Sequence, residues 1–369
     1  MVEGIALLDG RKIALINPGP PGTCGGVIAA ELRNGLSKYC DISHVFVEEN
    51  AVCEDSDWGG EPVAKVPFTV KKIRHWQVHR KLPYYDLYHY QSQRNLGLLK
   101  YDRKPGVLTC HGLAPLKAED VYTDGTKRRF LEQFRYMDRL EMVIANSKNT
   151  ADDLVRILEV PHKKIEVIYF GVNKEIFKPR PMDEIRTSLG LEMDARIVLN
   201  VGTERKNKNI DRLLDVFSRL ASEMDDLYLV RIGDKDSSFT ARLEELGLSD
   251  RVIRPGRIGN PAPWYNAADV YLCMDLHASF GMPNLEAMAS GCPVISSNVE
   301  AIPEIVGDAC RLVDPRNVEE TTLGLREILE SEACRKDLKE KGIDRAEQFS
   351  WEETARRTAV LYGQILGKG

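Results

Sequence analysis

The chain has 369 residues, more than one ordinary hydrophobic core holds, so we expect two domains of roughly 150–200 residues each. Hydrophobic residues make up 43% and charged residues 29%, the mean hydropathy is −0.31, and the net charge of −5 gives no sign of nucleic-acid binding. No apolar run reaches the ~18 residues that cross a bilayer, and the start of the chain lacks the features of a secretory signal, so we expect a cytoplasmic protein.

Short β-branched runs alternate with helical patterns along almost the whole chain. The first half shows this from KIALIN at 12–17 to IEVIYF at 165–170, and the second half restarts it with ARIVLNVG at 195–202. Between the halves, the segment 173–182 carries two prolines and is typical of a linker. Strands that alternate with helices form βαβ units, so we predict an α/β protein of two Rossmann-like domains, each with a doubly wound parallel sheet, facing a central cleft.

The loop PGPPGTCGG at 18–26 joins the first predicted strand to a helix. Gly25 and Gly26 would let the backbone approach a ligand closely, and the helix that follows presents free amides to an anion. The loop matches neither the dinucleotide fingerprint nor a P-loop. A merely tight strand-to-helix turn explains the glycines equally well, so both interpretations stay open.

The segment KKIRHWQVHRK at 71–81 mixes five Lys and Arg with two His and a Trp. Such a segment could touch a membrane surface, a lipid phosphate or a nucleic acid, although a solvated face is the more usual interpretation. The run of cations at 127–129 opens a predicted helix and could add to an anion site, with the same alternative.

His111 follows the predicted strand GVLTC at 106–110, which places it at the edge of the sheet where ligands bind. A histidine there can contact a ligand or handle a proton, although a structural histidine is the more common alternative. Asp86 and His89, in YDLYHYQ, pose the same question, and we expect both to belong to the fold.

Three cations, Arg205, Lys206 and Lys208, crowd the turn between a predicted strand ending at Gly202 and the helix that follows. Cations favour helix C-termini, so their clustering at an N-terminus works against the macrodipole and is explained by an anionic ligand. Two cations with backbone amides can neutralise a diphosphate and stabilise it as a leaving group. A solvated basic turn is the alternative.

The stretch HASFGMPNLEAMASGCPVIS at 277–296 predicts a tight turn, a short helix and a buried strand. Pro283 suits the first turn of that helix and Gly291 ends it, so we expect the amides of 282–285 to be free and to bind phosphate or sugar oxygens. Glu286 would repel phosphate, but a ribose diol offers two donors for its two oxygens. A helix-dipole or capping role is the alternative for this carboxylate.

At the end of the chain, Ser350 can cap a helix while Glu353 reaches back to it, which forms a capping box. One face of that helix must be buried against another element, which we expect to be the other domain. The residues of this face are Trp351, Thr354, Thr358, Leu361, Tyr362 and Ile365.

In combination, these motifs resemble those of the retaining glycosyltransferases of the GT-B fold, specifically glycosyltransferase family 4. The likeness spans nearly the whole chain and is most specific from 264 to 309. It rests on an ordered set of motifs: GTCGG, LTCHG, VIANSKNTADDL, IEVIYFGVNKEIFKP, VGTERKNKNIDRLL, WYNAADVYL, SFGMPNLEAMASGCPVISSNVEAIPEIVGDA and FSWEETARRTAVLY.

The resemblance implies an N-terminal acceptor domain at 1–175, a C-terminal nucleotide-sugar domain at 176–350, and a terminal helix at 351–369 that crosses back to the first domain. The roles that it implies are a phosphate-side glycine loop at Gly25 and Gly26, an active-site histidine at His111, a diphosphate lysine at Lys208 and a ribose-binding glutamate at Glu286. We expect the donor also to contact Phe280, Gly281, Met282, Pro283, Asn284 and Leu285.

The resemblance implies no metal and no cofactor, since family members usually need neither and the chain has no DxD-like motif placed to hold a metal. The eight cysteines form no CxxC pair, which argues against a zinc site and against a disulfide framework, and we expect reduced, mostly buried thiols. The donor would be a UDP or GDP sugar, bound as a substrate.

The chain departs from the family pattern in two places. The first glutamate of the E-x7-E motif, which contacts the donor sugar and supports charge in the transition state, is replaced by Ala278. Asp275 and His277 are nearby polar candidates to compensate. Thr203 stands directly after Gly202, where the family usually has an arginine, and we expect Arg205 to substitute for that arginine.

We therefore predict a glycosyltransferase of the hexosyltransferase type that moves a sugar from a nucleoside diphosphate to an acceptor hydroxyl with retention. Arg205 and Lys208 would stabilise the leaving diphosphate, and His111 would orient the donor sugar. Because of Ala278, a nucleotide-sugar-binding subunit or pseudoenzyme is the alternative; an epimerase or phosphorylase of the same fold is a more distant one. The acceptor could be a glycan, a lipid-linked molecule or a small molecule, with nucleic acid a weaker option, and 71–81 could give a peripheral membrane contact.

Overall fold

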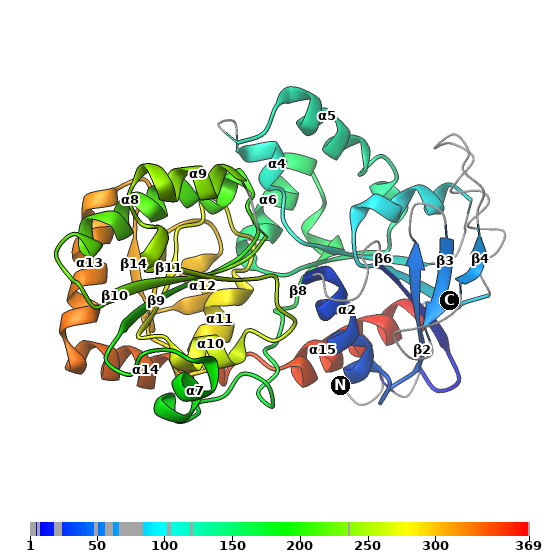
Figure 1. Ribbon diagram of the computed structural model, residues 1–369. Helices are drawn as coiled ribbons and strands as arrows, with labels where there is room; N and C mark the ends of the chain where they lie inside the picture. The colour runs from blue at the N-terminus through cyan, green and yellow to red at the C-terminus, as the bar shows by residue number, and fades with distance from the viewer. Residues whose placement is uncertain are drawn as a thin grey trace. The chain divides into compact units, whose positions relative to one another are not determined.

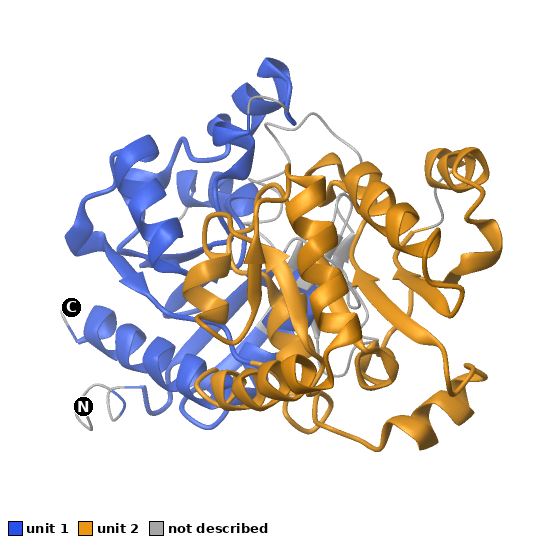
Figure 2. Ribbon diagram, turned by 90° about the vertical axis from the view of Figure 1, so that its left-hand side faces the viewer, with its two compact units in different colours: residues 1–171, 350–369 blue, residues 172–349 orange. Residues whose placement is uncertain are grey.

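The computed structural model describes residues 5, 8–17, 24–47, 51–55, 62–65, 84–101, 105–118, 121–234 and 237–367, and the basic segment 71–81 lies outside them. The chain divides into two compact units (Figure 2). Unit 1 holds residues 1–171 and 350–369, and unit 2 holds residues 172–349. Each unit has one sheet with helices packed on it (Figure 1).

The strands of unit 1 are β1 Lys12–Asn17, β2 Asp41–Val47, β3 Ala51–Asp55, β4 Pro62–Lys65, β5 Leu87–Tyr90, β6 Gly106–Cys110, β7 Met142–Ala145 and β8 Ile165–Val167. They form one sheet in the order β4-β3-β2-β1-β5-β6-β7-β8. All neighbours from β2 to β8 are parallel, but β3 and β4 pair antiparallel at one edge, which the expectation of a wholly parallel sheet missed. Only residues 48–50 separate β2 from β3, and a parallel crossover needs roughly a dozen, so the chain must turn back.

The strands of unit 2 are β9 Arg196–Val201, β10 Leu227–Ile232, β11 Val252–Gly256, β12 Val270–Cys273, β13 Val294–Ser297 and β14 Arg311–Val313. Their order is β11-β10-β9-β12-β13-β14, and all pairs are parallel. The strand order reverses between β9 and β12. In sheets of this kind, ligands bind in the crevice beyond the carboxyl ends of the strands at that point.

Helices and short 3-10 turns connect these strands. In unit 1 they are α2 Cys24–Leu36, η1 Gln93–Lys100, α4 Ala114–Lys117, α5 Asp124–Glu132, η2 Met137–Arg139, α6 Lys148–Leu158, η3 His162–Lys164 and α15 Trp351–Leu366. In unit 2 they are α7 Met182–Leu189, η4 Lys206–Lys208, α8 Ile210–Ala221, α9 Ser237–Glu245, η5 Ser249–Arg251, α10 Ala262–Ala267, α11 Met282–Ala289, α12 Ile302–Val306, α13 Val318–Glu330 and α14 Glu332–Ala346.

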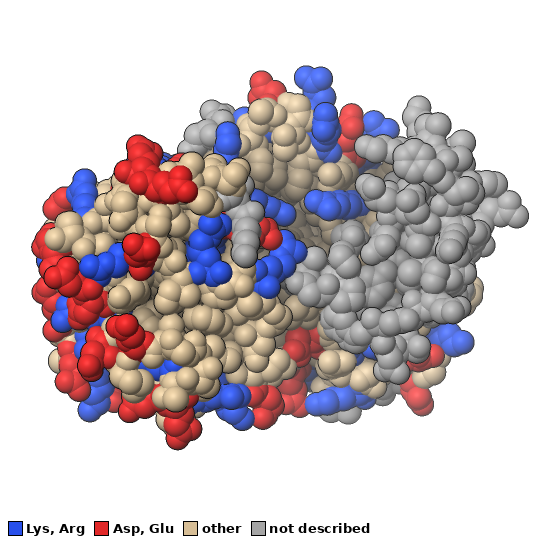
Figure 3. Space-filling model, viewed as in Figure 1, with Lys and Arg blue, Asp and Glu red and all other residues tan. Residues whose placement is uncertain are grey.

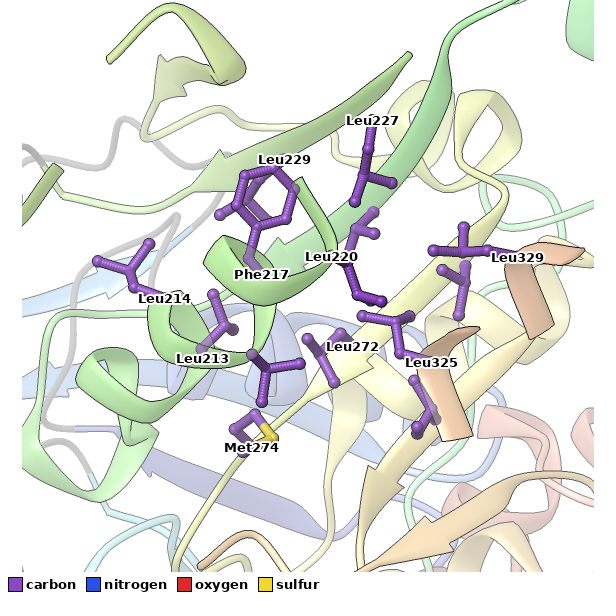
Figure 4. Packing of buried hydrophobic residues seen from close by; sticks show 14 of the residues in the cluster. Leu213, Leu214, Phe217, Leu220, Leu227, Leu229, Leu272, Met274, Leu325 and Leu329 are labelled. Atoms are coloured by element: carbon purple, nitrogen blue, oxygen red, sulfur yellow. The ribbon is translucent and has the colours of Figure 1, made fainter. Parts of the chain in front are cut away.

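The core of unit 2 fixes the helix that follows the basic turn. Leu213, Phe217 and Leu220 of α8 are fully buried, because helical spacing places them on one face. Figure 4 shows these side chains among those of β10, of the end of β12 and of α13, which all belong to one cluster. The start of α8, and with it η4, is therefore anchored to the sheet.

The terminal helix α15 packs in unit 1, against α2. Its predicted face is buried as expected, with Ile365 partly buried at its end. The Ser350 hydroxyl accepts from the Glu353 amide at 3.1 Å, but the Glu353 carboxylate pairs with Arg356. Only half of the predicted capping box therefore forms, because the arginine on the next turn binds the carboxylate.

The surface of unit 2 carries many charges of both signs. Figure 3 shows acidic side chains, with basic ones between them, gathered over the part of the surface formed by α13. Two ion pairs of this region are Arg219 with Glu319 at 2.7 Å and Arg326 with Glu223 at 2.8 Å. Such exposed pairs contribute little to stability. The six cysteines whose side chains the structure describes are all free, and four of them are buried, as predicted.

Candidate functional site

The loop after β9 is held by a buried arginine on the neighbouring strand. Arg231 of β10 is only 2% exposed, and it donates to the carbonyls of Gly202 at 2.9 Å and Thr203 at 3.2 Å. Glu204 binds the same guanidinium at 2.9 Å. A charge inside a buried strand is costly unless it is paired. The bonds that pair Arg231 also hold the loop after β9 in place, at the switch point of the sheet.

Lys208 lies at the end of η4, directly beyond that loop. Its Nζ is 2.6 Å from Oδ2 of Asp275, and the stem of its side chain lies against Gly202. The pair is partly buried, with side-chain exposures of 22% and 9%. Arg205, at the start of the same turn, is exposed. The two predicted cations therefore differ: one is fixed at the strand ends, and the other extends into solvent.

The segment after β12 contacts the basic turn directly. The amide of Leu276 donates to the Asn207 carbonyl at 2.8 Å, and the Asn207 side chain donates to the His277 carbonyl at 3.3 Å. These bonds join the two loops on either side of the switch point. The structure therefore brings together the cationic turn and the segment that leads into α11, within one unit.

The start of α11 matches the predicted turn but has fewer available amides. Gly281 adopts φ +84°, where an added Cβ would stand 2.9 Å from the Asn284 side chain. The Asn284 amide donates to the Gly281 carbonyl at 2.9 Å, so the expectation that all amides of 282–285 are free is wrong at this residue. Phe280 and Leu285 are buried inside the unit, so neither presents its side chain to a ligand.

Glu286 lies one turn inside α11 and binds a buried tyrosine. Tyr265 of α10 donates its hydroxyl to Oε2 of Glu286 at 3.0 Å. Burial raises the pKa of Glu286 to about 7, and the bond from Tyr265 opposes this shift. The carboxylate thus contacts a side-chain hydroxyl and not a helix amide, which argues against the capping alternative.

We expect the shifted pKa of Glu286 to make stability depend on pH. The folded protein holds this proton more tightly than the unfolded chain, so the stabilisation is present below about pH 4.5 and is lost as the pH rises through 7. Relative to Glu286→Gln, the free energy of unfolding of the wild type should fall by roughly 2–3 kcal/mol over that range. Urea unfolding of both proteins measures this difference, and a difference that is independent of pH would contradict the assignment.

Ala278 stands where the family has the first glutamate of its motif, and its backbone contacts another carboxylate. Ala278 is 9% exposed, and its amide donates to Oε2 of Glu300 at 2.9 Å. Oε1 of Glu300 is 3.0 Å from Nδ1 of His277. Glu300 comes from the loop after β13 and has φ +47°. No sequence pattern indicates a role for this carboxylate, because motif spacing does not reveal a left-handed backbone.

In unit 1, His111 lies where the sequence places it, after β6. Its ring is 5.5 Å from that of Phe170, and burial lowers its pKa to about 4 against the effect of a bond with the Gln91 backbone. The ring is therefore neutral at physiological pH. Gln91 follows β5, and its amide donates to the Ile16 carbonyl of β1 at 2.8 Å. The sequence reasoning missed this glutamine, which links the ends of three neighbouring strands.

Gly25 and Gly26 lie in the first turn of α2, after β1. The buried Asn17, the last residue of β1, donates to the Gly25 carbonyl at 3.4 Å. A Cβ on Gly25 would come no closer than 3.9 Å to Asn17, so packing alone does not require a glycine there. The tight-turn interpretation of the loop is weakened at this residue.

His89 and Asp86 belong to the fold, as predicted. His89 is completely buried between the Tyr362 hydroxyl of α15 and the Thr109 hydroxyl of β6. Asp86 accepts from the Lys12 amide and pairs with Arg11. These contacts connect β5 to its neighbours and to the terminal helix.

No group of three or more potential metal-ligating side chains occurs within the parts of the chain given above. In the same parts, the structure contains no helix that is both long and apolar enough to cross a bilayer.

Two family models match the chain. "Glycosyltransferase Family 4" matches residues 45–176, and "Glycosyl transferases group 1" matches residues 181–345. The chain is 30% identical to a D-inositol 3-phosphate glycosyltransferase of Streptomyces bingchenggensis over 329 residues, which cover 83% of this chain and 72% of the relative.

Solved structures resemble the chain over almost its whole length. Sucrose-phosphate synthase from Thermosynechococcus elongatus has a TM-score of 0.82 at 21% identity, covering 97% of this chain and 100% of that one. HepE from Anabaena, solved in complex with UDP-glucose, has a TM-score of 0.77 at 17% identity over the same shares. At these identities the likeness establishes the fold, which is the predicted GT-B fold of two Rossmann-like units.

Proposed function

The chain belongs to glycosyltransferase family 4 and is a sugar-transferring enzyme, and from that premise we propose that it moves a sugar from a nucleoside diphosphate to an acceptor hydroxyl with retention. One observation carries the assignment of the donor site. The basic turn with Lys208 and the segment leading to Glu286 are hydrogen-bonded to each other at the switch point of unit 2. That arrangement supports one bound diphosphate with its ribose on the adjacent helix.

We propose a distinct role for each group. Lys208 and the exposed Arg205 neutralise the diphosphate together with amides at the start of α11, so that no metal is required. Glu286 accepts hydrogen bonds from the ribose diol in its carboxylate form. Unit 2 binds the nucleotide and unit 1 binds the acceptor. In unit 1, Gly25 and Gly26 are the glycines that admit a phosphate.

The reaction proceeds by attack on the face from which the diphosphate leaves. The bond from the anomeric carbon to the β-phosphate oxygen breaks, and a bond to the acceptor oxygen forms on the same face. The departing phosphate oxygen takes the acceptor proton, so no protein base is needed. The neutral imidazole of His111 orients the sugar, and its pKa of about 4 suits a hydrogen-bonding group better than a cation.

A nucleotide-sugar-binding subunit is the second candidate, and the observation that favours it is Ala278 at the position of a family carboxylate. Such a subunit would bind the nucleotide and release no diphosphate. Its binding would also be unaffected by His111→Ala. An epimerase or phosphorylase would instead isomerise the sugar or depend on inorganic phosphate.

The test is diphosphate release from UDP-glucose, UDP-N-acetylglucosamine and GDP-mannose, with D-inositol 3-phosphate as the first acceptor because a relative is named for it. We expect turnover with one donor and a product of unchanged anomeric configuration. NMR of the anomeric proton measures that configuration. His111→Ala should lower this turnover. Nucleotide binding without turnover for every donor and acceptor would favour the binding subunit.

A further inference from the structure

Glu300 has a backbone conformation that glutamate rarely adopts. It follows β13 and precedes α12, with φ +47°. The left-handed region brings Cβ close to the carbonyl oxygen, so it disfavours every residue with a side chain. Such conformations persist only where surrounding contacts enforce them, and they are frequent at ligand sites. Its contacts therefore need an explanation.

Two hydrogen bonds fix the carboxylate of Glu300 on the neighbouring loop. One oxygen accepts from the Ala278 amide at 2.9 Å, and the other is 3.0 Å from Nδ1 of His277. The side chains of Glu300 and His277 are each 14% exposed. The Ala301 amide also donates to the Ala278 carbonyl at 3.3 Å. The loop after β13 is thus joined to residues 277–278, and it places a negative charge where residue 278 itself has none.

The same segment contacts the basic turn. Asn207 binds the His277 carbonyl, and Asp275 pairs with Lys208. A diphosphate on Lys208 would be repelled by a second carboxylate, so the ligand group that suits Glu300 is neutral. Hydroxyl groups fit, because carboxylates and imidazoles both form hydrogen bonds with them.

We propose that Glu300, positioned by the Ala278 amide and His277, binds hydroxyl groups of the sugar in the donor and so determines which sugar is transferred. This inference rests on the proposed function, because the sugar is placed by its attachment to the diphosphate. It assigns to the loop after β13 a carboxylate that the motif lacks at Ala278.

The main test compares Glu300→Gly with Glu159→Gly. Both glutamates have a positive φ, and Glu159 is the C-cap of α6 in unit 1, so glycine relieves a positive φ at both positions. Glu300→Gln adds a variant of unchanged size. For each protein, the dissociation constants of UDP, UDP-glucose and UDP-galactose are measured by calorimetry, with donor turnover and the unfolding midpoint.

We expect Glu300→Gly to bind UDP as the wild type does, but to lose about 10- to 100-fold of the additional affinity for the preferred UDP-sugar. Its preference between the two sugars should narrow, and its unfolding midpoint should not fall, because the strained conformation is relieved. The affinity and the sugar preference of Glu300→Gln should fall between those of the wild type and of Glu300→Gly. Glu159→Gly should match the wild type in both.

An unchanged ratio of UDP-sugar to UDP affinity in Glu300→Gly would overturn the inference. So would equal weakening of UDP and UDP-sugars together with a lower unfolding midpoint, which would make Glu300 a purely structural link between loops. A wild type that binds no nucleotide at all would instead overturn the proposed function, so the two failures are distinguishable.

Discussion

Lys208→Met should lower kcat/KM for the donor by about 100- to 1,000-fold, the range found when a group that stabilises transition-state charge is removed. The ammonium is fixed 2.6 Å from Asp275 at the ends of β9 and β12, where the leaving diphosphate is proposed to bind. Methionine keeps most of the stem that packs on Gly202 and removes the charge. Initial rates of diphosphate release over a range of donor concentrations measure the effect.

A matched control separates this effect from the general loss of a lysine. Lys341 on α14 also pairs with an aspartate, Asp337 at 2.7 Å, but that pair is exposed. Lys341→Met should leave kcat/KM unchanged. Lys208→Met leaves the Asp275 carboxylate without its partner. The double variant Lys208→Met with Asp275→Asn removes that carboxylate charge as well, and we expect it to regain the stability that the single variant loses, but not the turnover. Normal turnover in Lys208→Met would refute the role of this lysine.

Gly171→Ala should be strongly destabilising, by about 3 kcal/mol, at the upper end of overpacking effects. A Cβ on Gly171 would stand 2.1 Å from the backbone nitrogen of Trp351 and 2.3 Å from the carbonyl carbon of Ser350. The contacted atoms are backbone at the start of α15, so no side chain can move aside. Thermal unfolding should shift down by roughly 6–12 °C.

Gly259→Ala is the control for this substitution. Gly259 lies on the surface, its φ is not positive, and no atom lies within 4 Å of the added Cβ. We expect the alanine there to be neutral or slightly stabilising, since it restricts the unfolded chain. If Gly171→Ala unfolds at the same temperature as Gly259→Ala, the close approach of α15 is not as described.

The alternation of strands and helices was sufficient to predict both Rossmann-like units. The period of the apolar residues set the buried face of α15, because the side chains of a helix repeat in space every three to four residues. The antiparallel β3 and β4 were missed, because the length of the connection after β2, and not the strand pattern, decides the direction of pairing.

In the candidate site, the sequence located the basic turn and Glu286, since cations before a helix and a carboxylate inside one contradict ordinary preferences. It could not reveal contacts between distant segments. Three residues act through segments that meet only when their unit is folded: Gln91 in unit 1, and Arg231 and Glu300 in unit 2. Arg231 alone gave a signal, as a lone charge inside an apolar strand.

The proposed donor site holds one nucleoside diphosphate at the switch point of unit 2, and a structure of the protein with UDP bound would show whether it binds there. We expect the diphosphate within hydrogen-bonding distance of Nζ of Lys208 and of the backbone at the start of α11, with the ribose hydroxyls on the Glu286 carboxylate. UDP bound away from Lys208, or with its ribose away from Glu286, would overturn the assignment of this donor site.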